Sequence, residues 1–152
     1  MKIIIAGAGE VGMYLAKMLA NEHHEIVVID PKEDRLEEVS THYDLLTVQG
    51  SATSFEKLKE AGVKNADLFV AVTHELEVNI TACIISKKLG AKRTIARIDN
   101  REYLLPINKA QFISLGIDSL VYPQMLAARE VVNLLSQTGT SEVFNFSGGS
   151  LS

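Results

Sequence analysis

The sequence predicts an α/β protein with one doubly wound parallel sheet, whose strands lie in the order 3-2-1-4-5-6. Three observations predict this fold class. Short segments rich in β-branched and apolar residues alternate with amphipathic segments, in units of about 20–30 residues. A glycine-rich turn joins the first strand to the first helix, and an acidic residue ends the second strand. Right-handed crossovers then give the strand order and bring the carboxyl ends of the strands to one edge.

The first element is a buried strand at residues 2–6, followed by the motif GAGEVG and an amphipathic helix that runs to about residue 21. Its glycines have the G-x-G-x-x-G spacing, in the order strand, turn and helix that a dinucleotide site of the Rossmann type requires. Gly7 permits a tight turn, Gly9 leaves room for a diphosphate, and Gly12 lets the helix pack on the strand. The candidate phosphate-binding residues are Gly7, Ala8, Gly9, Glu10, Val11 and Gly12.

The second strand, residues 25–30, ends in Asp30, eighteen positions after Gly12. A carboxylate at this place can accept hydrogen bonds from both hydroxyls of an adenosine ribose, and it repels a 2′-phosphate, so it favours NAD(H) over NADP(H). The alternative is that Asp30 only caps the helix that begins after Pro31. Because the glycines, the strand, the helix and the acid agree, we favour the nucleotide site.

The remaining elements follow from the same periodicities. We expect helices at residues 32–43, 55–61 and 75–89, a helix interrupted by Pro106 and ending at Gly116, a last helix at 123–136, and strands at 45–49, 68–72, 94–98, 119–122 and 142–146. Ser54 should cap the helix that follows it. The helix at 75–89 should direct Val78, Ala82, Ile85 and Leu89 inward, with Cys83 in or near the core.

Small and polar residues follow the later strands, at the edge where a ligand would lie. They are Gly50, Ser51, Ala52 and Thr53 after the third strand, Thr73 after the fourth, and Arg97 near the end of the fifth. Ligands of open α/β sheets bind at the carboxyl ends of the strands. These residues are therefore further candidates for the same site.

The composition excludes several classes of protein. At 152 residues and 47% hydrophobic content, the chain is expected to form one domain with a sizeable core. A net charge of −4 without a basic stripe argues against nucleic acid as a partner. One cysteine excludes an internal disulfide and fits a reducing cytoplasm, and the four histidines lack metal-ligand spacing. No apolar run approaches a membrane span, and because a core strand begins at residue 2 we expect no signal peptide before it.

Four stretches together resemble the N-terminal domains of the TrkA-N family, also called RCK or KTN domains. They are GAGEVG, VVIDPKEDRLEEV, VQGSATSFEKLKEAGVKNADLFVAVTHELEVNITACIISKKLGAKRTIARI and YPQMLAAREVVNLL. The resemblance covers residues 1–137 and implies a Rossmann fold in a cytoplasmic regulatory subunit of a Trk-type potassium uptake system. It implies binding of NAD(H), or of ATP or ADP, and docking of a homodimer or larger ring on a membrane transporter subunit of the TrkH or TrkG type, at the inner face of the membrane and without insertion. Residues 138–152 resemble a linker and the start of a truncated C-terminal segment.

The resemblance also implies roles for particular residues. Asp30 and the adjoining Pro31 would lie at the ribose, and Arg35 beside the adenine. Ser51, Ala52 and Thr53 match the loop on the adenine side, although the family often has Asn or Asp in place of Ser51. Thr73, Glu75 and Asn79 match the side of the nicotinamide or terminal phosphate, and Arg97 matches a basic residue on the fifth strand. The resemblance implies no catalytic residue.

Two other functions remain as alternatives. An NAD-dependent oxidoreductase domain would need a substrate domain and a proton-transfer group, for which His74 is the one histidine near the expected cofactor face. The simpler interpretation of His74 is an exposed residue at a helix start. A protein-interaction module with an empty glycine turn is the other alternative.

Glu10 beside the phosphate site would repel a terminal phosphate, so we expect weaker binding of ATP than of NADH unless Glu10 points to solvent.

The helix at 123–136 is expected to make a contact between subunits. Its apolar residues, Met125, Leu126, Ala127, Ala128, Val131, Val132, Leu134 and Leu135, occupy more than one face, whereas a helix that covers a sheet needs only one. The alternative is that the strand at 142–146 covers the second face within the same chain.

Overall fold

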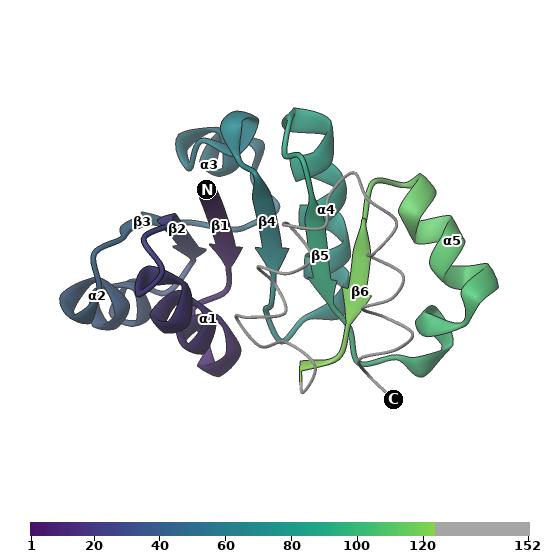
Figure 1. Ribbon diagram of the computed structural model, residues 1–152, viewed down its shortest axis with the longest axis horizontal. Helices are drawn as coiled ribbons and strands as arrows, with labels where there is room; N and C mark the ends of the chain where they lie inside the picture. The colour runs from purple at the N-terminus through teal and green to yellow at the C-terminus, as the bar shows by residue number, and fades with distance from the viewer. Residues whose placement is uncertain (124–152) are drawn as a thin grey trace.

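The computed structural model describes residues 1–123 (Figure 1). The strands are β1 (Lys2–Ala6), β2 (Glu25–Asp30), β3 (Leu46–Gln49), β4 (Leu68–Ala71), β5 (Thr94–Arg97) and β6 (Ser119–Val121). The helices are α1 (Glu10–Ala20), α2 (Glu33–His42), α3 (Phe55–Glu60), α4 (Leu76–Leu89) and α5 (Pro106–Ser114), with 3-10 turns η1 (Val63–Asn65) and η2 (Arg101–Leu104). The helix predicted at 123–136, the linker after it and the strand predicted at 142–146 lie outside the described residues.

The six strands form one parallel sheet in the order β3-β2-β1-β4-β5-β6, which confirms the predicted doubly wound fold (Figure 1). The chain leaves β1 for β2 on one side and returns through α3 to β4 on the other. The order therefore reverses between β1 and β4, and the loops after these two strands separate there. This switch point is where the site is built.

Each face of the sheet carries its own apolar layer, because side chains alternate along a strand. Ile3 and Ile5 of β1 pack with Leu15 of α1 and Val39 of α2 on one face. Ile4 and Ala6 of the same strand pack on the other face with Leu58 of α3 and with Ala82 of α4. Every residue of β4 is buried, as a central strand of a parallel sheet requires.

The inward face of α4 agrees with the prediction in part, since Ile85 and Leu89 pack against the core, but its most buried residues are centred about one position further along the chain. Ala82 is buried as expected, but its buried neighbours are Asn79, Cys83 and Ser86, while Val78, Ile85 and Leu89 are only partly buried. Apolar residues of α4 lie on most sides of the helix, and Leu76, Ile80 and Ile84 are also partly buried. Periodicity alone therefore does not select the inward face. The small side chains let α4 approach the sheet closely.

Cys83 lies in the core, as predicted, and its thiol donates a hydrogen bond to the carbonyl of Ile95 at 3.4 Å. Burial away from water raises the pKa of the Cys83 thiol. The thiol is therefore protonated at neutral pH and is not a reactive nucleophile.

Asp67, in the turn before β4, holds the first residue of β1 in place. Its carboxylate accepts a hydrogen bond from the backbone N–H of Lys2 at 2.8 Å and pairs with Lys92 at 3.3 Å. The Lys2 hydrogen bond, followed by Lys92, lowers the pKa of Asp67 below its usual value against the opposing effect of burial.

Within residues 1–123, no helix has the length and apolar character needed to cross a bilayer.

Candidate functional site

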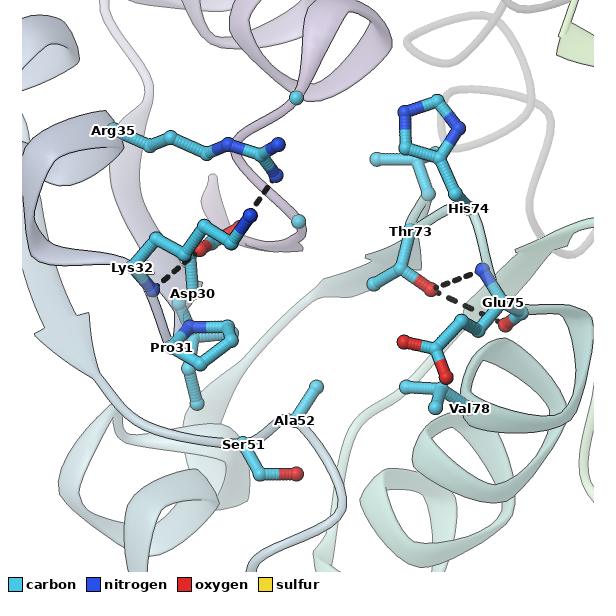
Figure 2. Close-up of a pocket in the computed structure, with 14 residues that line it drawn as sticks. Asp30, Pro31, Lys32, Arg35, Ser51, Ala52, Thr73, His74, Glu75 and Val78 are labelled. Carbon is cyan, nitrogen blue, oxygen red and sulfur yellow. Dashed lines mark hydrogen bonds and ion pairs between the residues drawn. The ribbon is translucent and has the colours of Figure 1, made fainter.

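A cavity of about 280 Å³ opens at the switch point of the sheet, close to the lower size of small-molecule sites (~300 Å³). Its walls come from the loops after β1, β2, β3 and β4. Figure 2 shows Asp30, Lys32 and Arg35 on one wall and Thr73, His74 and Glu75 on the other. The residues that line it are Gly7, Gly9, Ile29, Asp30, Pro31, Lys32, Arg35, Ser51, Ala52, Val72, Thr73, His74, Glu75 and Val78.

The three glycines of the turn after β1 differ in what a side chain would meet. Gly7 has φ of +108°, and a Cβ there would lie 3.1 Å from Thr73. A Cβ on Gly12 would overlap the carbonyl oxygen of Gly7, so this helix-strand contact requires glycine. A Cβ on Gly9 would meet only ordinary contacts, with His74 Nε2 at 3.5 Å and Arg35 Nη1 at 3.9 Å. Gly9 itself lines the cavity, so a ligand there would lie over it between His74 and Arg35.

Asp30 ends β2 with its side chain turned into this cavity, although only 3% of the residue is exposed. One carboxylate oxygen accepts the backbone N–H of Ala8 at 2.7 Å, and the other accepts that of Lys32 at 2.8 Å. A carboxylate offers about four acceptor positions. The two backbone bonds fix its orientation and leave capacity for the hydroxyl groups of a ligand.

Two cations of the loop and helix after β2 lie beside Asp30. The guanidinium of Arg35 is 4.0 Å from the Asp30 carboxylate and is half-buried. Its Nη1 also approaches the space above Gly9, so Arg35 faces the glycine turn. The place beside the adenine that the resemblance implies for Arg35 stays a prediction. Lys32 is exposed at the same wall.

The loop after β3 forms the floor of the cavity in Figure 2, where Ser51 and Ala52 lie. The Ser51 hydroxyl accepts the backbone N–H of Thr53 at 3.1 Å and lies 2.8 Å from the Thr53 hydroxyl. Thr53 thus orients Ser51 without lining the cavity itself. Ser54 caps α3 by accepting the N–H of Lys57, as predicted.

Asn79 fixes the wall after β4, and only 1% of the residue is exposed. Its Oδ1 accepts the N–H of Thr73 at 2.9 Å and the Thr73 hydroxyl at 2.7 Å. Its Nδ2 donates to the carbonyls of Thr73 at 3.0 Å and Arg97 at 2.9 Å. All four hydrogen-bonding positions of the amide are used, so Asn79 joins the loop after β4 to the end of β5 and is placed to position the site.

The structure brings nine of the predicted site residues to the cavity wall: Gly7, Gly9, Asp30, Pro31, Arg35, Ser51, Ala52, Thr73 and Glu75. Asn79 and Arg97 line a smaller hollow beside it, together with Thr73, His74 and Asp99. Six predicted residues line neither space, namely Ala8, Glu10, Val11, Gly12, Gly50 and Thr53. Ala8 is buried in the turn, Gly12 is buried within α1, and Gly50 donates its N–H to the Asp30 carbonyl at 3.0 Å. Glu10 is exposed at the start of α1, and its effect on a bound phosphate stays a prediction.

Five lining residues are additional to the predicted set: Ile29, Lys32, Val72, His74 and Val78. Ile29 and Val72 precede Asp30 and Thr73, so position at a strand end could have identified them. Val78 was assigned to the core by the same apolar pattern that shifted the predicted face of α4. His74 is exposed, as the simpler interpretation of it predicts, and it also lines the cavity.

Comparisons with known proteins identify the family. The TrkA-N domain model matches residues 3–123. The Trk system potassium uptake protein TrkA homolog of Archaeoglobus fulgidus is 43% identical over 150 residues, which are 98% of this chain and 34% of that protein. This chain thus spans about a third of the length of that relative.

Two solved structures share the fold. The TrkA-N domain of the inner membrane protein ybaL from Escherichia coli has a TM-score of 0.70 at 20% identity, over 88% of this chain and 96% of that one. The GsuK channel bound to NAD has a TM-score of 0.65 at 20% identity, over 79% of this chain and 21% of that one. From the family match and the sequence identity together, the chain belongs to the TrkA-N domain family.

Proposed function

We propose that this chain is the nucleotide-binding domain of a regulatory subunit of Trk-type potassium uptake and that it binds NAD(H). The observation that carries the proposal is the carboxylate of Asp30, held by two backbone N–H groups at the cavity wall beside a glycine turn whose Gly9 lines the same cavity. A ribose fits the first feature and a diphosphate fits the second. The names of the relatives, Trk system potassium uptake protein TrkA, supply the potassium context.

Asp30 favours NAD(H) over NADP(H) because a 2′-phosphate would meet its buried negative charge. ATP and ADP share the adenosine and remain weaker candidates. They lack the second ribose and nicotinamide, for which Thr73, Glu75 and Val78 offer a mixed polar and apolar wall. The NAD-bound GsuK channel, which shares the fold, supports the choice of a dinucleotide.

The regulatory role would come from a difference in nucleotide affinity between two arrangements of subunits. In this proposal the domain works in the cytoplasm as a homodimer or larger ring, docked on a membrane potassium transporter of the TrkH or TrkG type. A nucleotide that bridges the walls after β2 and β4 would change the angle between neighbouring subunits and so act on the transporter. The domain itself carries no catalytic residue in this role.

A thermal-shift panel of NADH, NAD, NADPH, ATP and ADP tests the proposal. A ligand at one hundred times its dissociation constant stabilises the folded state by about 2.7 kcal/mol, which raises the midpoint of a domain of this size by roughly 8–10 °C. NADH should give the largest shift and NADPH a smaller one. A shift with NADPH equal to that with NADH, or no shift with any of the five, would contradict the proposal.

The alternative of an NAD-dependent oxidoreductase rests on one observation, the position of His74 and Glu75 at the cavity wall. A group that transfers a proton must reach the reacting atom of a substrate. Turnover of NAD with simple alcohols and 2-hydroxy acids separates the two functions. The regulatory proposal predicts no reduction of NAD above the protein-free rate, and steady NADH production would favour the enzyme.

A further inference from the structure

We propose that His74 and Arg35 form a two-sided clamp for the diphosphate of the bound nucleotide, and that protonation of His74 tightens binding. The inference rests on the proposed function and goes further by naming the groups that hold the diphosphate and the solution condition that controls them. Neither the loop after β4 nor Arg35 belongs to the glycine turn. The clamp is thus an addition to the turn itself.

The side-chain nitrogens of His74 and Arg35 converge on the space over Gly9. The position that a Cβ atom on Gly9 would occupy lies 3.5 Å from His74 Nε2 and 3.9 Å from Arg35 Nη1. The two nitrogens reach it from opposite walls, since Arg35 comes from α2 and His74 from the loop after β4 (Figure 2). A diphosphate laid across Gly9 would therefore have a nitrogen donor on each side. Donors with positive charge make the shorter and stronger hydrogen bonds to phosphate.

The protonation state of His74 decides the net charge of the cavity wall. Asp30 and Glu75 contribute two negative charges to the wall, and Lys32 and Arg35 contribute two positive charges. These cancel, so a neutral His74 leaves the wall without net charge and a protonated His74 gives it one positive charge. Histidine is the side chain that ordinarily changes charge between pH 5 and 8.

Other charged groups face His74 from the neighbouring elements. Glu75 follows it in the chain, Arg35 faces it from α2, and Arg97 and Asp99 share the smaller hollow with it at the end of β5. Asp30 and Lys32 lie on the opposite wall, and Glu10 is exposed at the start of α1. Glu10 lines neither space, and without it the three acids and three bases named here balance, so the diphosphate is the main new charge that His74 meets.

The test uses calorimetry with NAD at pH 6.0 and pH 8.0 on wild type, His74→Gln, His74→Lys and Arg35→Gln. For an exposed charge at this distance we expect wild type to bind roughly three- to tenfold more tightly at the lower pH. His74→Gln should lose that difference, and His74→Lys should keep tight binding at pH 8.0, because its charge is permanent. Arg35→Gln should weaken binding at both pH values.

His42→Gln is the matched control, because His42 is an exposed histidine at the end of α2 and away from the cavity. It should show the affinity and pH dependence of wild type. Unfolding of each variant without ligand should match wild type, which separates a clamp from a structural role. If His74→Gln binds NAD with the affinity and pH dependence of wild type, the clamp is wrong while nucleotide binding stands. If wild type does not bind NAD or NADH, the proposed function fails, and the clamp fails with it.

Discussion

Replacing Gly9 by alanine separates nucleotide binding from stability. Gly9 is the N-cap of α1 with φ of −78° and ψ of −160°, a conformation that alanine also adopts. The added methyl would make only ordinary contacts in the protein, 3.5 Å from His74 and 3.9 Å from Arg35. It would occupy the space in which we place the diphosphate. The variant should therefore fold normally and bind poorly.

The magnitudes follow from opposing effects. Alanine is a poorer N-cap than glycine by up to about 1 kcal/mol. It also restricts the unfolded chain, which stabilises the folded state by about 0.4–1 kcal/mol. The free energy of unfolding should then change by less than about 1 kcal/mol. A diphosphate displaced from the backbone should lose at least ~1.4 kcal/mol of binding, which is tenfold in affinity. Binding is thus the property that changes.

Gly12→Ala is the matched control within the same turn. Helix propensity favours alanine by about 1 kcal/mol, but the methyl would overlap the Gly7 carbonyl oxygen, and overpacking of that kind costs about 1–3 kcal/mol or more. Gly12→Ala should lose stability in urea unfolding, and Gly9→Ala should lose NADH binding in calorimetry. If Gly9→Ala bound NADH within threefold of wild type, the diphosphate would not lie at Gly9 and our assignment of the turn would be refuted.

Three further substitutions test the remaining parts of the account. Asp30→Asn keeps the shape of the side chain and removes its charge, so the preference for NADH over NADPH in calorimetry should fall by at least about tenfold; an unchanged preference would remove Asp30 from specificity. Asn79→Leu deprives Thr73 and the Arg97 carbonyl of their partners and should lower the free energy of unfolding by about 2–4 kcal/mol in urea. A change under ~0.5 kcal/mol would contradict the role of Asn79 in joining the loop after β4 to the end of β5. Asp67 has a lowered pKa in the folded state, so its ionised form stabilises the protein above the ordinary aspartate value of 3.8, and this contribution is lost as the pH falls through the lower folded value. The stability difference between wild type and Asp67→Asn, from urea unfolding at several pH values, should therefore be largest near neutral pH and shrink in acid; a difference that grows in acid would reverse the sign of the argument.

Much of the fold could be predicted because each element has a strong local pattern. The β-branched run at β1, the glycine turn and the acid that ends β2 identified three elements and their order, and right-handed crossovers supplied the rest. The inward face of α4 could be predicted only in part, because apolar residues lie on most sides of that helix. Burial of Asn79 depends on backbone partners at Thr73 and Arg97 that only the folded sheet brings together.

The site was predictable where it follows the ends of strands. Asp30, Thr73 and the loop at 50–53 were named because parallel strands end at one edge, and most of them line the cavity. Lys32 was not named, and His74 was named only as a proton-transfer candidate of the alternative function, because the direction of an exposed side chain is set by the loop that carries it and leaves no periodic signal. Arg35 was named for a different contact, since its sequence position does not show that its guanidinium turns toward Gly9.

A crystal structure of this chain grown with saturating NADH tests the central claim most directly. We predict that the adenosine ribose hydroxyls will lie within hydrogen-bonding distance of the Asp30 carboxylate, with the diphosphate over Gly9 between Arg35 and His74. A dinucleotide bound away from the switch point of the sheet, or a cavity that stays empty at saturating NADH, would contradict the account.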